Sequence, residues 1–328
     1  MPLVRTSLHR RALLAAGAAG AAVPLLGLRA ANAAAPFVGS NAPPYYRFRH
    51  GAFECTVVSD GPLVLPPLRD VLLTAPRAEV ERLLTLNALP TESWTGPQNV
   101  LVVNTGRHLV LFDTGMGDRS KALGPDNGRL LANLRLAGIN PASIDVVAIT
   151  HAHIDHCWGL VDAQDRLNFP NAQVAISQAD FDYWTQESLL SNPAARDFVL
   201  YTRTNLLPVR DRLIAVRDGG EVVPGVTAMA TPGHTAGHHS YMIESEGRRL
   251  VNLGDILHHH VLLVQHPEWH NVFDSDKEAG AATRRRVVEQ LAADGTQVVV
   301  YHFPFPGLGT VGRDGQQRTW LPTPVHQG

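Results

Sequence analysis

The sequence predicts an α/β fold in which two β-sheets are sandwiched between layers of helices. Short apolar segments with strand character alternate along the chain with amphipathic segments of helical periodicity. The strand segments form two blocks, and helices lie between and outside the strands, which is typical of sheets covered by helices. Several strand segments also end directly in His or Asp, which places polar side chains at the carboxyl edge of a sheet, where α/β proteins bind ligands.

The first block begins with a strand at residues 53–59, which the turn Asp60-Gly61-Pro62 is expected to close. An amphipathic helix at residues 78–85 follows. Residues 100–104 and 108–112 then flank a short turn and predict a hairpin. The remaining elements of this block are helices at 128–137, 178–185 and 193–207 and strands at 144–149 and 173–176.

The second block contains strands at 213–216, 226–230, 240–244 and 249–253. A long helix at residues 278–291 and a last strand at residues 298–301 complete the predicted fold.

Residues 1–35 are interpreted as an export signal. Arg10 and Arg11 precede an apolar run, and the small residues at 31–34 suit a signal-peptidase cut. Residues 7–14 resemble a twin-arginine signal, and an ordinary secretory signal is the alternative. A retained membrane anchor is disfavoured because the apolar run is short and weakly apolar. We therefore expect a periplasmic or secreted protein whose residues 36–328 form one domain, since no linker or repeat divides them.

The charge of the chain disfavours nucleic acid as a partner, and its cysteine content disfavours a disulfide-stabilised fold. Removing residues 1–35 takes four of the 28 basic residues and none of the 30 acidic ones, so the mature chain is acidic. Without a basic run it has no electrostatic footprint for nucleic acid, and small neutral substrates are expected. Two cysteines, Cys55 and Cys157, are too few for a disulfide framework.

A histidine-rich run, from His151 to His156, directly follows the apolar strand at 144–149. His151 and His153 lie two residues apart on an extended segment, so both imidazoles can reach one ion. Asp155 and His156 lie in the following turn and suit a second ion, because paired ions in hydrolytic sites are about 3.5–4 Å apart. This run predicts half of a two-metal site.

Four donors cannot complete two coordination shells, so further donors must come from distant loops. Three candidates follow apolar strands: His234 in a Gly/Pro loop, Asp255 after Leu253-Gly254, and His302 after Val300-Tyr301. Each is a metal-binding residue type at the carboxyl end of a strand.

With the earlier Asp113-Thr114-Gly115, these motifs occur in the order found in the metallo-β-lactamase-fold hydrolases. The chain resembles that family over essentially its whole mature length. The resemblance implies a four-layer αββα sandwich of two mixed sheets, with two Zn²⁺ or other divalent transition metal ions. The implied ligands are His151, His153 and His234 for one ion, Asp155, His156 and His302 for the other, and Asp255 as a bridge. Asp113 would orient a ligand histidine, with a plain turn residue as the alternative.

Four shorter segments, at residues 128–134, 169–172, 223–226 and 303–309, resemble the branch that contains methyl parathion hydrolase and related exported lactonases and esterases. The chain departs from that branch at Cys157-Trp158 and at His258-His259-His260, which bears on the substrate and not on the metal site. Cys157 is interpreted as a small buried hydrophobe. Candidate pocket residues, with core packing as the alternative, are Trp158, Trp184, Phe303 and Phe305. His258 is a further candidate, with simple alternation on a strand or loop as its alternative.

Two divalent ions that share a water lower its pKa to near neutrality and supply a bridging hydroxide as nucleophile. Asp155 and Asp255 are the predicted catalytic carboxylates, and Asp155 would help to move the proton. We therefore predict an exported dinuclear-zinc hydrolase of a small apolar ester, a lactone or aryl ester.

Phosphotriester hydrolysis is the close alternative, because the same nucleophile can attack phosphorus. A β-lactam hydrolase and a non-catalytic zinc-binding protein are further alternatives. A glyoxalase-type thioesterase would be expected in the cytosol, and diiron oxidoreductase relatives place Glu where this chain has His153. The expected partner is a small-molecule ester, with no stable membrane insertion after signal removal, and a homodimer is possible.

Overall fold

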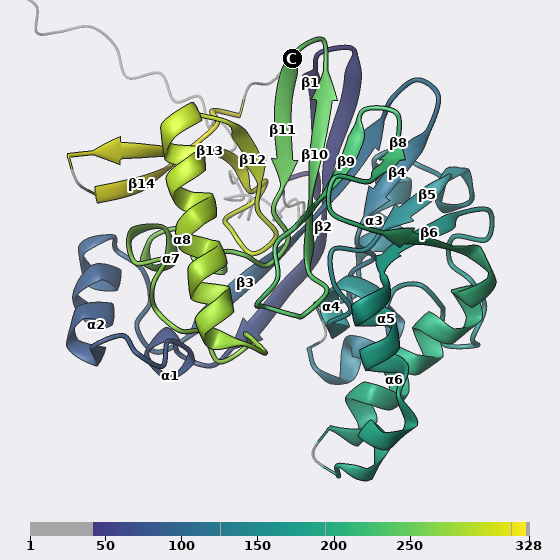
Figure 1. Cartoon of the computed structure of the whole chain (residues 1–328), viewed down its shortest axis with the longest axis horizontal. Helices are drawn as coiled ribbons and strands as arrows, with labels where there is room; N and C mark the ends of the chain where they lie inside the picture. Colours follow the sequence, from purple (N-terminus) through teal and green to yellow (C-terminus); the bar gives the residue numbers. More distant parts are fainter. Residues whose placement is uncertain (1–41, 125, 194, 316, 326–328) are drawn as a thin grey trace, which may run out of the picture. The chain divides into compact units, whose positions relative to one another are not determined.

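The computed structural model describes residues 42–124, 126–193, 195–315 and 317–325 (Figure 1). The predicted export signal at residues 1–35 lies outside these ranges. Within them, we find no helix with the length and apolar character needed to cross a bilayer.

Two seven-stranded sheets form the centre of the fold. Across the first sheet lie β1 (Tyr45–His50), β2 (Phe53–Leu65), β3 (Trp94–Asn104), β4 (Leu109–Phe112), β5 (Val146–Ala148), β6 (Gln173–Ser177) and β7 (Leu213–Val216). Strands β1 to β4 pair antiparallel, and β4 to β7 pair parallel. The first sheet is therefore mixed.

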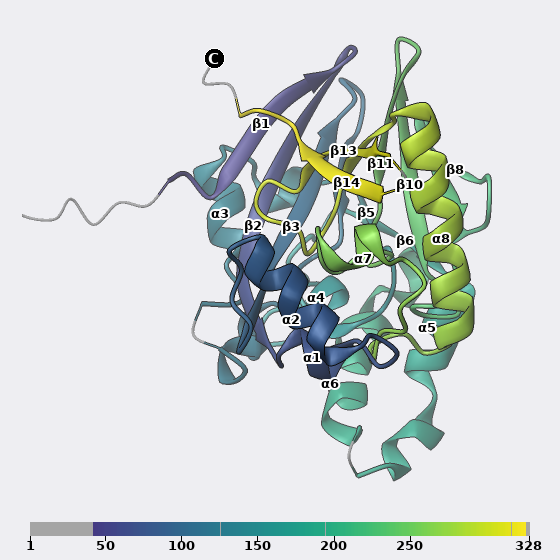
Figure 2. The same ribbon diagram turned by 90° about the vertical axis from the view of Figure 1, so that its left-hand side faces the viewer.

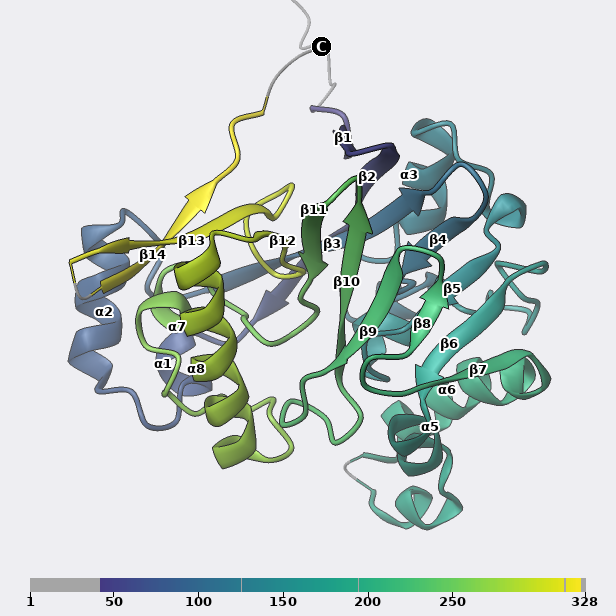
Figure 3. The ribbon, with the colours of Figure 1, turned by 45° about the horizontal axis from the view of Figure 1, so that its top comes forward.

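The second sheet has the strand order β14-β13-β12-β11-β10-β9-β8 (Figure 3). Its strands are β8 (Glu221–Val223), β9 (Val226–Ala230), β10 (His239–Ser245), β11 (Arg248–Asn252), β12 (Gln297–Val299), β13 (Leu308–Asp314) and β14 (Gln317–Pro322). Only β11 and β12 pair parallel, so this sheet is mixed as well.

Helices cover the outer faces of both sheets. Those on the first sheet and its loops are α3 (Leu130–Leu136), α4 (Ile154–Cys157), α5 (Gln178–Thr185) and α6 (Arg196–Leu206). Those on the second sheet are α1 (Leu68–Val71), α2 (Arg77–Leu86), α7 (Leu262–Gln265) and α8 (Lys277–Asp294) (Figure 2). Four short 3₁₀ helices lie in loops: η1 (Asp118–Ala122), η2 (Pro141–Ser143), η3 (Glu187–Ser191) and η4 (Leu207–Arg212).

Three hydrophobic cores account for the four layers. The core between the sheets joins side chains such as Leu101 and Phe112 of the first sheet to Tyr241 and Ile243 of the second. A second core packs the outer face of the first sheet against α3, α5 and α6. The third core packs the outer face of the second sheet against α1, α2, α7 and α8. The predicted four-layer αββα sandwich is confirmed.

Helix α8 shows how local sequence sets the ends of an element. The side chain of Asp276 caps its first turn by accepting a hydrogen bond from the Ala279 amide. Gly295 ends it with φ +65°, in the left-handed region that glycine adopts without strain.

Several predicted boundaries are wrong. Strand β3 begins at Trp94, well before the predicted start at residue 100. Strand β2 does not end at Ser59: Asp60 and Gly61 form a bulge, and the strand continues to Leu65 because Pro62 pairs with Pro97 of β3. The buried Asp60 carboxylate stabilises the bulge by accepting hydrogen bonds from the amides of Met116 and Leu130. The predicted last strand at residues 298–301 is followed by β13 and β14, whose side chains are largely polar at the solvent-facing end.

Candidate metal centre

The seven predicted donors follow strands of both sheets and meet at one edge of the sandwich. His151 and His153 come directly after β5, and Asp155 and His156 lie in the single turn of α4 that His153 begins. His234 lies in the loop from β9 to β10, Asp255 follows β11, and His302 follows β12. All seven are buried except His153, which is partly exposed. The structure therefore brings every predicted donor together.

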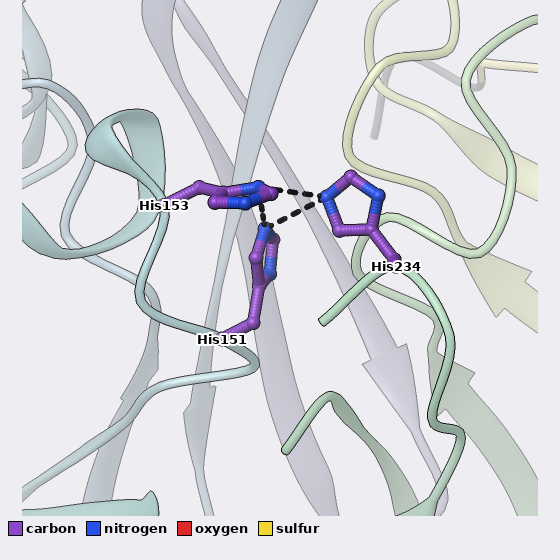
Figure 4. Close-up of side chains that lie close together, drawn as sticks. All are labelled: His151, His153 and His234. Atoms are coloured by element: carbon purple, nitrogen blue, oxygen red, sulfur yellow. Dashed lines mark hydrogen bonds between the residues drawn. The ribbon is translucent and has the colours of Figure 1, made fainter. Parts of the chain in front are cut away.

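The first cluster consists of His151, His153 and His234, whose rings converge on one point (Figure 4). The Nε2 atoms of His151 and His234 are 3.1 Å apart. The Nδ1 atom of His153 lies 3.0 Å from the first and 2.8 Å from the second. Three donors on a tetrahedral zinc ion, with bonds of 2.0–2.1 Å, would be about 3.3 Å apart. The triangle therefore matches one face of a zinc site.

The second cluster consists of Asp155, His156, Asp255 and His302. Oδ2 of Asp255 lies 3.3 Å from Nε2 of His156 and 3.2 Å from Nε2 of His302. Oδ2 of Asp155 lies 3.5 Å and 3.3 Å from the same two nitrogens. Imidazole and carboxylate donors at these separations suit a divalent transition metal.

Asp255 reaches both clusters. Its Oδ2 lies 3.5 Å from Nε2 of His234 in the first cluster, in addition to its contacts in the second. This is the position that the predicted bridging role requires. The Nε2 atom of His238 accepts a hydrogen bond from the Asp255 amide and so helps to fix this carboxylate.

Unsatisfied polar atoms also favour a cation here. Nε2 of His156 and Oδ1 of Asp255 are buried and have no hydrogen-bond partner in the described part of the chain. A buried polar atom without a partner is costly, so such atoms in a native protein call for an ion or a water. The residues therefore fit metal ions at both clusters.

Hydrogen bonds behind the rings select the tautomers. Nδ1 of His302 lies 2.9 Å from the Pro97 carbonyl oxygen, and Nδ1 of His156 lies 2.9 Å from Oδ2 of Asp113. Oxygen acceptors at these positions hold the proton on Nδ1 and leave the Nε2 lone pair for a metal ion. Asp113 thus lies behind His156, a predicted ligand, and it also accepts hydrogen bonds from the amide and hydroxyl of Thr150.

The two clusters differ in electrostatics. Burial and the neighbouring His234 lower the pKa of His153 to about 3. Burial also acts to lower the pKa of His302, but the carboxylates of Asp255 and Asp155 outweigh it and raise this pKa to about 10. His153 therefore offers a neutral imidazole with a free lone pair, and the carboxylates of Asp155 and Asp255 in the second cluster attract a positive charge.

Two buried carboxylates that support the centre were not predicted from the sequence. Asp180 on α5 is buried and accepts hydrogen bonds from the Ala152 amide, the Thr235 hydroxyl and the Gly237 amide. It thereby ties the histidine run to the loop that carries His234. Asp274 lies behind His234. Neither residue stands at a recognisable spacing from the motifs, so no sequence pattern marked either of them.

A cavity of about 260 Å³ opens onto both clusters. The donors on its floor are His153, Asp155, His234, Asp255 and His302, together with His258. Its walls are apolar and consist of Leu63, Leu65, Ile154, Trp184, Phe198 and Phe273. Leu63 and Leu65 reach the cavity only because β2 continues past its bulge. The predicted pocket residues Trp184 and His258 lie in the lining.

The other three predicted pocket residues lie elsewhere. The Trp158 ring is buried against Phe198, and its indole N–H donates a hydrogen bond to Thr202 on α6. Phe303 is fully buried in the core on the outer face of the second sheet. Phe305 lies in a separate groove beside Trp320. Packing, the alternative weighed from the sequence, describes Trp158 and Phe303.

Relatives of known sequence share part of the chain. An N-acyl homoserine lactonase from Bacillus cereus is 30% identical over 128 residues, which are 39% of this chain and 44% of that protein. A probable metallo-hydrolase from Mycobacterium tuberculosis is 25% identical over 189 residues, which are 49% of this chain and 57% of that protein. The chain thus spans about half the length of the curated relatives that it matches.

Solved structures match over most of the chain. AidC, a dizinc quorum-quenching lactonase in complex with the product N-hexanoyl-L-homoserine, superposes with a TM-score of 0.80 at 27% identity, covering 86% of this chain and 98% of AidC. The hydrolase AbOPH of the beta lactamase superfamily gives a TM-score of 0.80 at 26% identity, covering 88% of this chain and all of AbOPH (100%).

The sequence model described as "Metallo-beta-lactamase superfamily" matches residues 94–302, which include every predicted metal ligand. That match spans more than half of the chain, and the two sheets and the order of the donors agree with it. The chain therefore belongs to the metallo-beta-lactamase superfamily.

Proposed function

We propose that the protein is a dinuclear-zinc hydrolase that opens a small lactone with an apolar substituent. One observation carries the proposal: a cavity with apolar walls opens directly onto both donor clusters. A lactone needs both parts, because its carbonyl reacts at the polar floor while its acyl chain packs against the walls. The lactonases among the relatives and solved structures support this choice over other esters.

Divalent ions held by the seven donors would lower the pKa of a bound water to near neutrality and polarise the substrate carbonyl. The reaction adds the water oxygen to the carbonyl carbon, breaks the ring C–O bond and leaves a proton on the ring oxygen. The carboxylate of Asp155 faces the cavity and is the chain's own group for moving that proton. The Tyr301 hydroxyl donates a hydrogen bond to the Asp155 backbone carbonyl and so helps to hold this segment in place.

The walls of the cavity define the substrate class. Trp184 packs edge-on against His153, with ring centroids 5.6 Å apart, and so joins the apolar wall to the first cluster. Phe198 and Phe273 add aromatic surface on other sides. The cavity volume is close to the lower limit of about 300 Å³ for small-molecule sites, which favours a short or medium acyl chain over a bulky substrate.

The test is a substrate panel with zinc-loaded protein. Lactones of increasing acyl length, an aryl ester, a phosphotriester and a β-lactam are compared by kcat/KM. We expect lactones with a medium acyl chain to give the highest value. If the protein binds zinc but hydrolyses none of these substrates, the proposal is contradicted and the protein is a non-catalytic zinc-binding protein.

Phosphotriester hydrolysis is the second candidate. The sequence segments at 128–134 and 303–309, which resemble the methyl parathion hydrolase branch, favour it. The same floor can serve a tetrahedral phosphorus, and the aromatic walls can hold an aryl leaving group. A kcat/KM for the phosphotriester above that of every lactone would favour this candidate.

We also propose that residues 1–35 export the protein to the periplasm or beyond by the twin-arginine route. The test fuses these residues to a reporter that leaves the cytosol only in folded form. Replacing Arg10 and Arg11 by Lys should keep the reporter in the cytosol. Failure of the unchanged residues 1–35 to export this reporter, together with export of a second reporter that crosses only unfolded, would instead support an ordinary secretory signal.

A further inference from the structure

Arg284 on α8 is a buried cation that the proposed reaction does not use. It is 1% exposed and heads the fully buried side chains of the described residues by volume. Its Nε donates a hydrogen bond of 3.0 Å to the Pro267 carbonyl, and its Nη2 donates one of 3.0 Å to the Trp269 carbonyl. Its Nη1 donates a third hydrogen bond, of 3.3 Å, to the Ile256 carbonyl. A buried guanidinium is tolerated only with such acceptors.

The charged partner of Arg284 is Asp274, which is also 1% exposed. Nη2 of Arg284 lies 3.0 Å from Oδ2 of Asp274. The other carboxylate oxygen, Oδ1, lies 3.1 Å from Nδ1 of His234, a donor of the first cluster. The three side chains therefore form a continuous chain of contacts from the body of α8 to the metal centre.

The direction of these hydrogen bonds is fixed by chemistry. A guanidinium only donates, and a carboxylate paired with it only accepts. Oδ1 of Asp274 therefore requires a proton on Nδ1 of His234. That tautomer leaves the lone pair of His234 Nε2 directed at His151 and His153, as metal binding requires.

The surrounding backbone leaves Asp274 and His234 little freedom. The Ser275 amide donates a hydrogen bond of 2.9 Å to the His234 carbonyl, and the Asp276 amide donates one of 3.0 Å to the Gly233 carbonyl. A side chain at Gly280 would place its Cβ 2.6 Å from Oδ2 of Asp274. The first turns of α8 thus pack directly against the loop that carries the ligand.

We infer that Arg284 and Asp274 are positioning residues that set the tautomer and orientation of His234 and thereby the metal affinity of the first cluster. A carboxylate behind a ligand histidine is a general way to fix its orientation, and its loss typically costs about 10- to 100-fold in metal affinity. This role rests on metal binding by the centre and does not depend on a lactone being the substrate.

The test is Asp274→Asn, which keeps the volume and removes one acceptor. Two donors then compete for a single amide oxygen. Because Arg284 cannot accept a hydrogen bond, the oxygen turns toward it, and the amide NH₂ faces His234. This favours the tautomer with the proton on Nε2, which cannot bind a metal through that atom. We expect about 10- to 100-fold weaker binding of one of two zinc ions, measured by chelator competition, and an altered cobalt absorption spectrum.

Asp276→Ala is the matched control. It removes the cap of the same helix two residues away, and the Asp276 side chain accepts its hydrogen bond from Ala279 and not from the ligand loop. We expect a lower Tm and unchanged affinity for both zinc ions. Equal loss of affinity in Asp274→Asn and Asp276→Ala would overturn the inference, because the effect would then come from loosening α8. Wild-type affinity in Asp274→Asn would overturn it as well.

Arg284→Met and Arg284→Lys test whether the contact of Arg284 with Asp274 also contributes to zinc affinity. The lysine variant keeps the charge beside Asp274, so it should recover part of the zinc affinity that the methionine variant loses. A further measurement uses the zinc-loaded wild-type protein and so does not depend on the folding of any variant. Imidazole ¹⁵N NMR should show the His234 proton on Nδ1, and a proton on Nε2 would contradict the inference.

Discussion

Oδ2 of Asp113 lies 2.9 Å from Nδ1 of His156, and both side chains are fully shielded from solvent. Asp113 holds this position with φ +65°, a backbone conformation that Asp and Asn adopt more readily than other non-glycine residues. The unusual backbone conformation of Asp113 therefore places its carboxylate where it can orient the ring of His156, a predicted ligand.

Asp113→Asn should keep the fold and weaken zinc binding at the second cluster. Asn tolerates the backbone conformation of residue 113. Its single amide oxygen, however, can accept a hydrogen bond from either the Thr150 amide or Nδ1 of His156, and not from both. We expect about 10- to 100-fold weaker binding of one zinc ion, measured by chelator competition. Asp113→Ala should be less stable as well, because it leaves buried donors unpaired. Unchanged zinc affinity in the Asn variant would show that Asp113 is only a turn residue.

His153→Ala and Asp255→Ala should each abolish hydrolysis and lower the zinc content of the protein. Each removes a donor that faces other donors within the centre. Zinc is measured by elemental analysis after dialysis, and activity with the lactone panel. His270→Ala serves as the control, because His270 lies outside both clusters and contacts Thr74 through its backbone amide. Two zinc ions per chain in either ligand variant would refute the assignment of that residue.

Phe198→Ala should raise KM for lactones with longer acyl chains and leave kcat nearly unchanged. Phe198 lines the cavity and is 41% exposed, and it is not one of the predicted donors, so its ring contributes apolar contact to a bound substrate. Loss of about 1–2 kcal/mol of apolar contact corresponds to about 5- to 30-fold in KM. Phe305→Ala is a matched control, since Phe305 is 39% exposed and lies in a different groove. An equal effect of both variants would argue against acyl binding in this cavity.

Neither cysteine should react with a thiol reagent in the native protein. Burial raises the pKa of Cys55 to about 12, and burial likewise raises the pKa of the Cys157 thiol. Since the thiolate is the reactive form, raising the pH from 7 to 9 should not start labelling of the folded state. Unfolding returns both thiols to ordinary values near 8.5, so urea should expose two reactive groups per chain. Labelling of Cys157 without unfolding would contradict its assignment as a buried hydrophobe.

The donor set could be predicted from the sequence because its signals are local. Each of His234, Asp255 and His302 follows an apolar strand, and strand ends of neighbouring strands meet at one edge. The residues that orient the donors gave no such signal. Asp180 lies on a helix and Asp274 in a loop, and only the folded chain brings them behind the ligands.

Helices and strands with a strong hydrophobic periodicity could be predicted from the sequence. Strand ends that depend on hydrogen bonding to a neighbouring strand could not. The longer helices and the inner strands β4, β5, β6, β9, β10 and β11 lie close to their predicted ranges, whereas β2 and β3 are longer than predicted. Asp60-Gly61-Pro62 has the composition of a turn, and only its pairing with β3 makes it a bulge. β1, β8, β13 and β14 were missed because Gly and polar residues in these strands interrupt the continuous apolar pattern of buried strands.

The donors come from opposite halves of the sandwich: four follow β5 of the first sheet, and three follow strands of the second. Both cysteines are free, so no disulfide joins these halves. Bound ions would therefore link the two sheets. Because the ions bind only the folded chain, their binding free energy would raise the free energy of unfolding. The supply of zinc in the surrounding compartment would then govern how long each molecule survives proteolysis, in addition to how fast it turns over substrate.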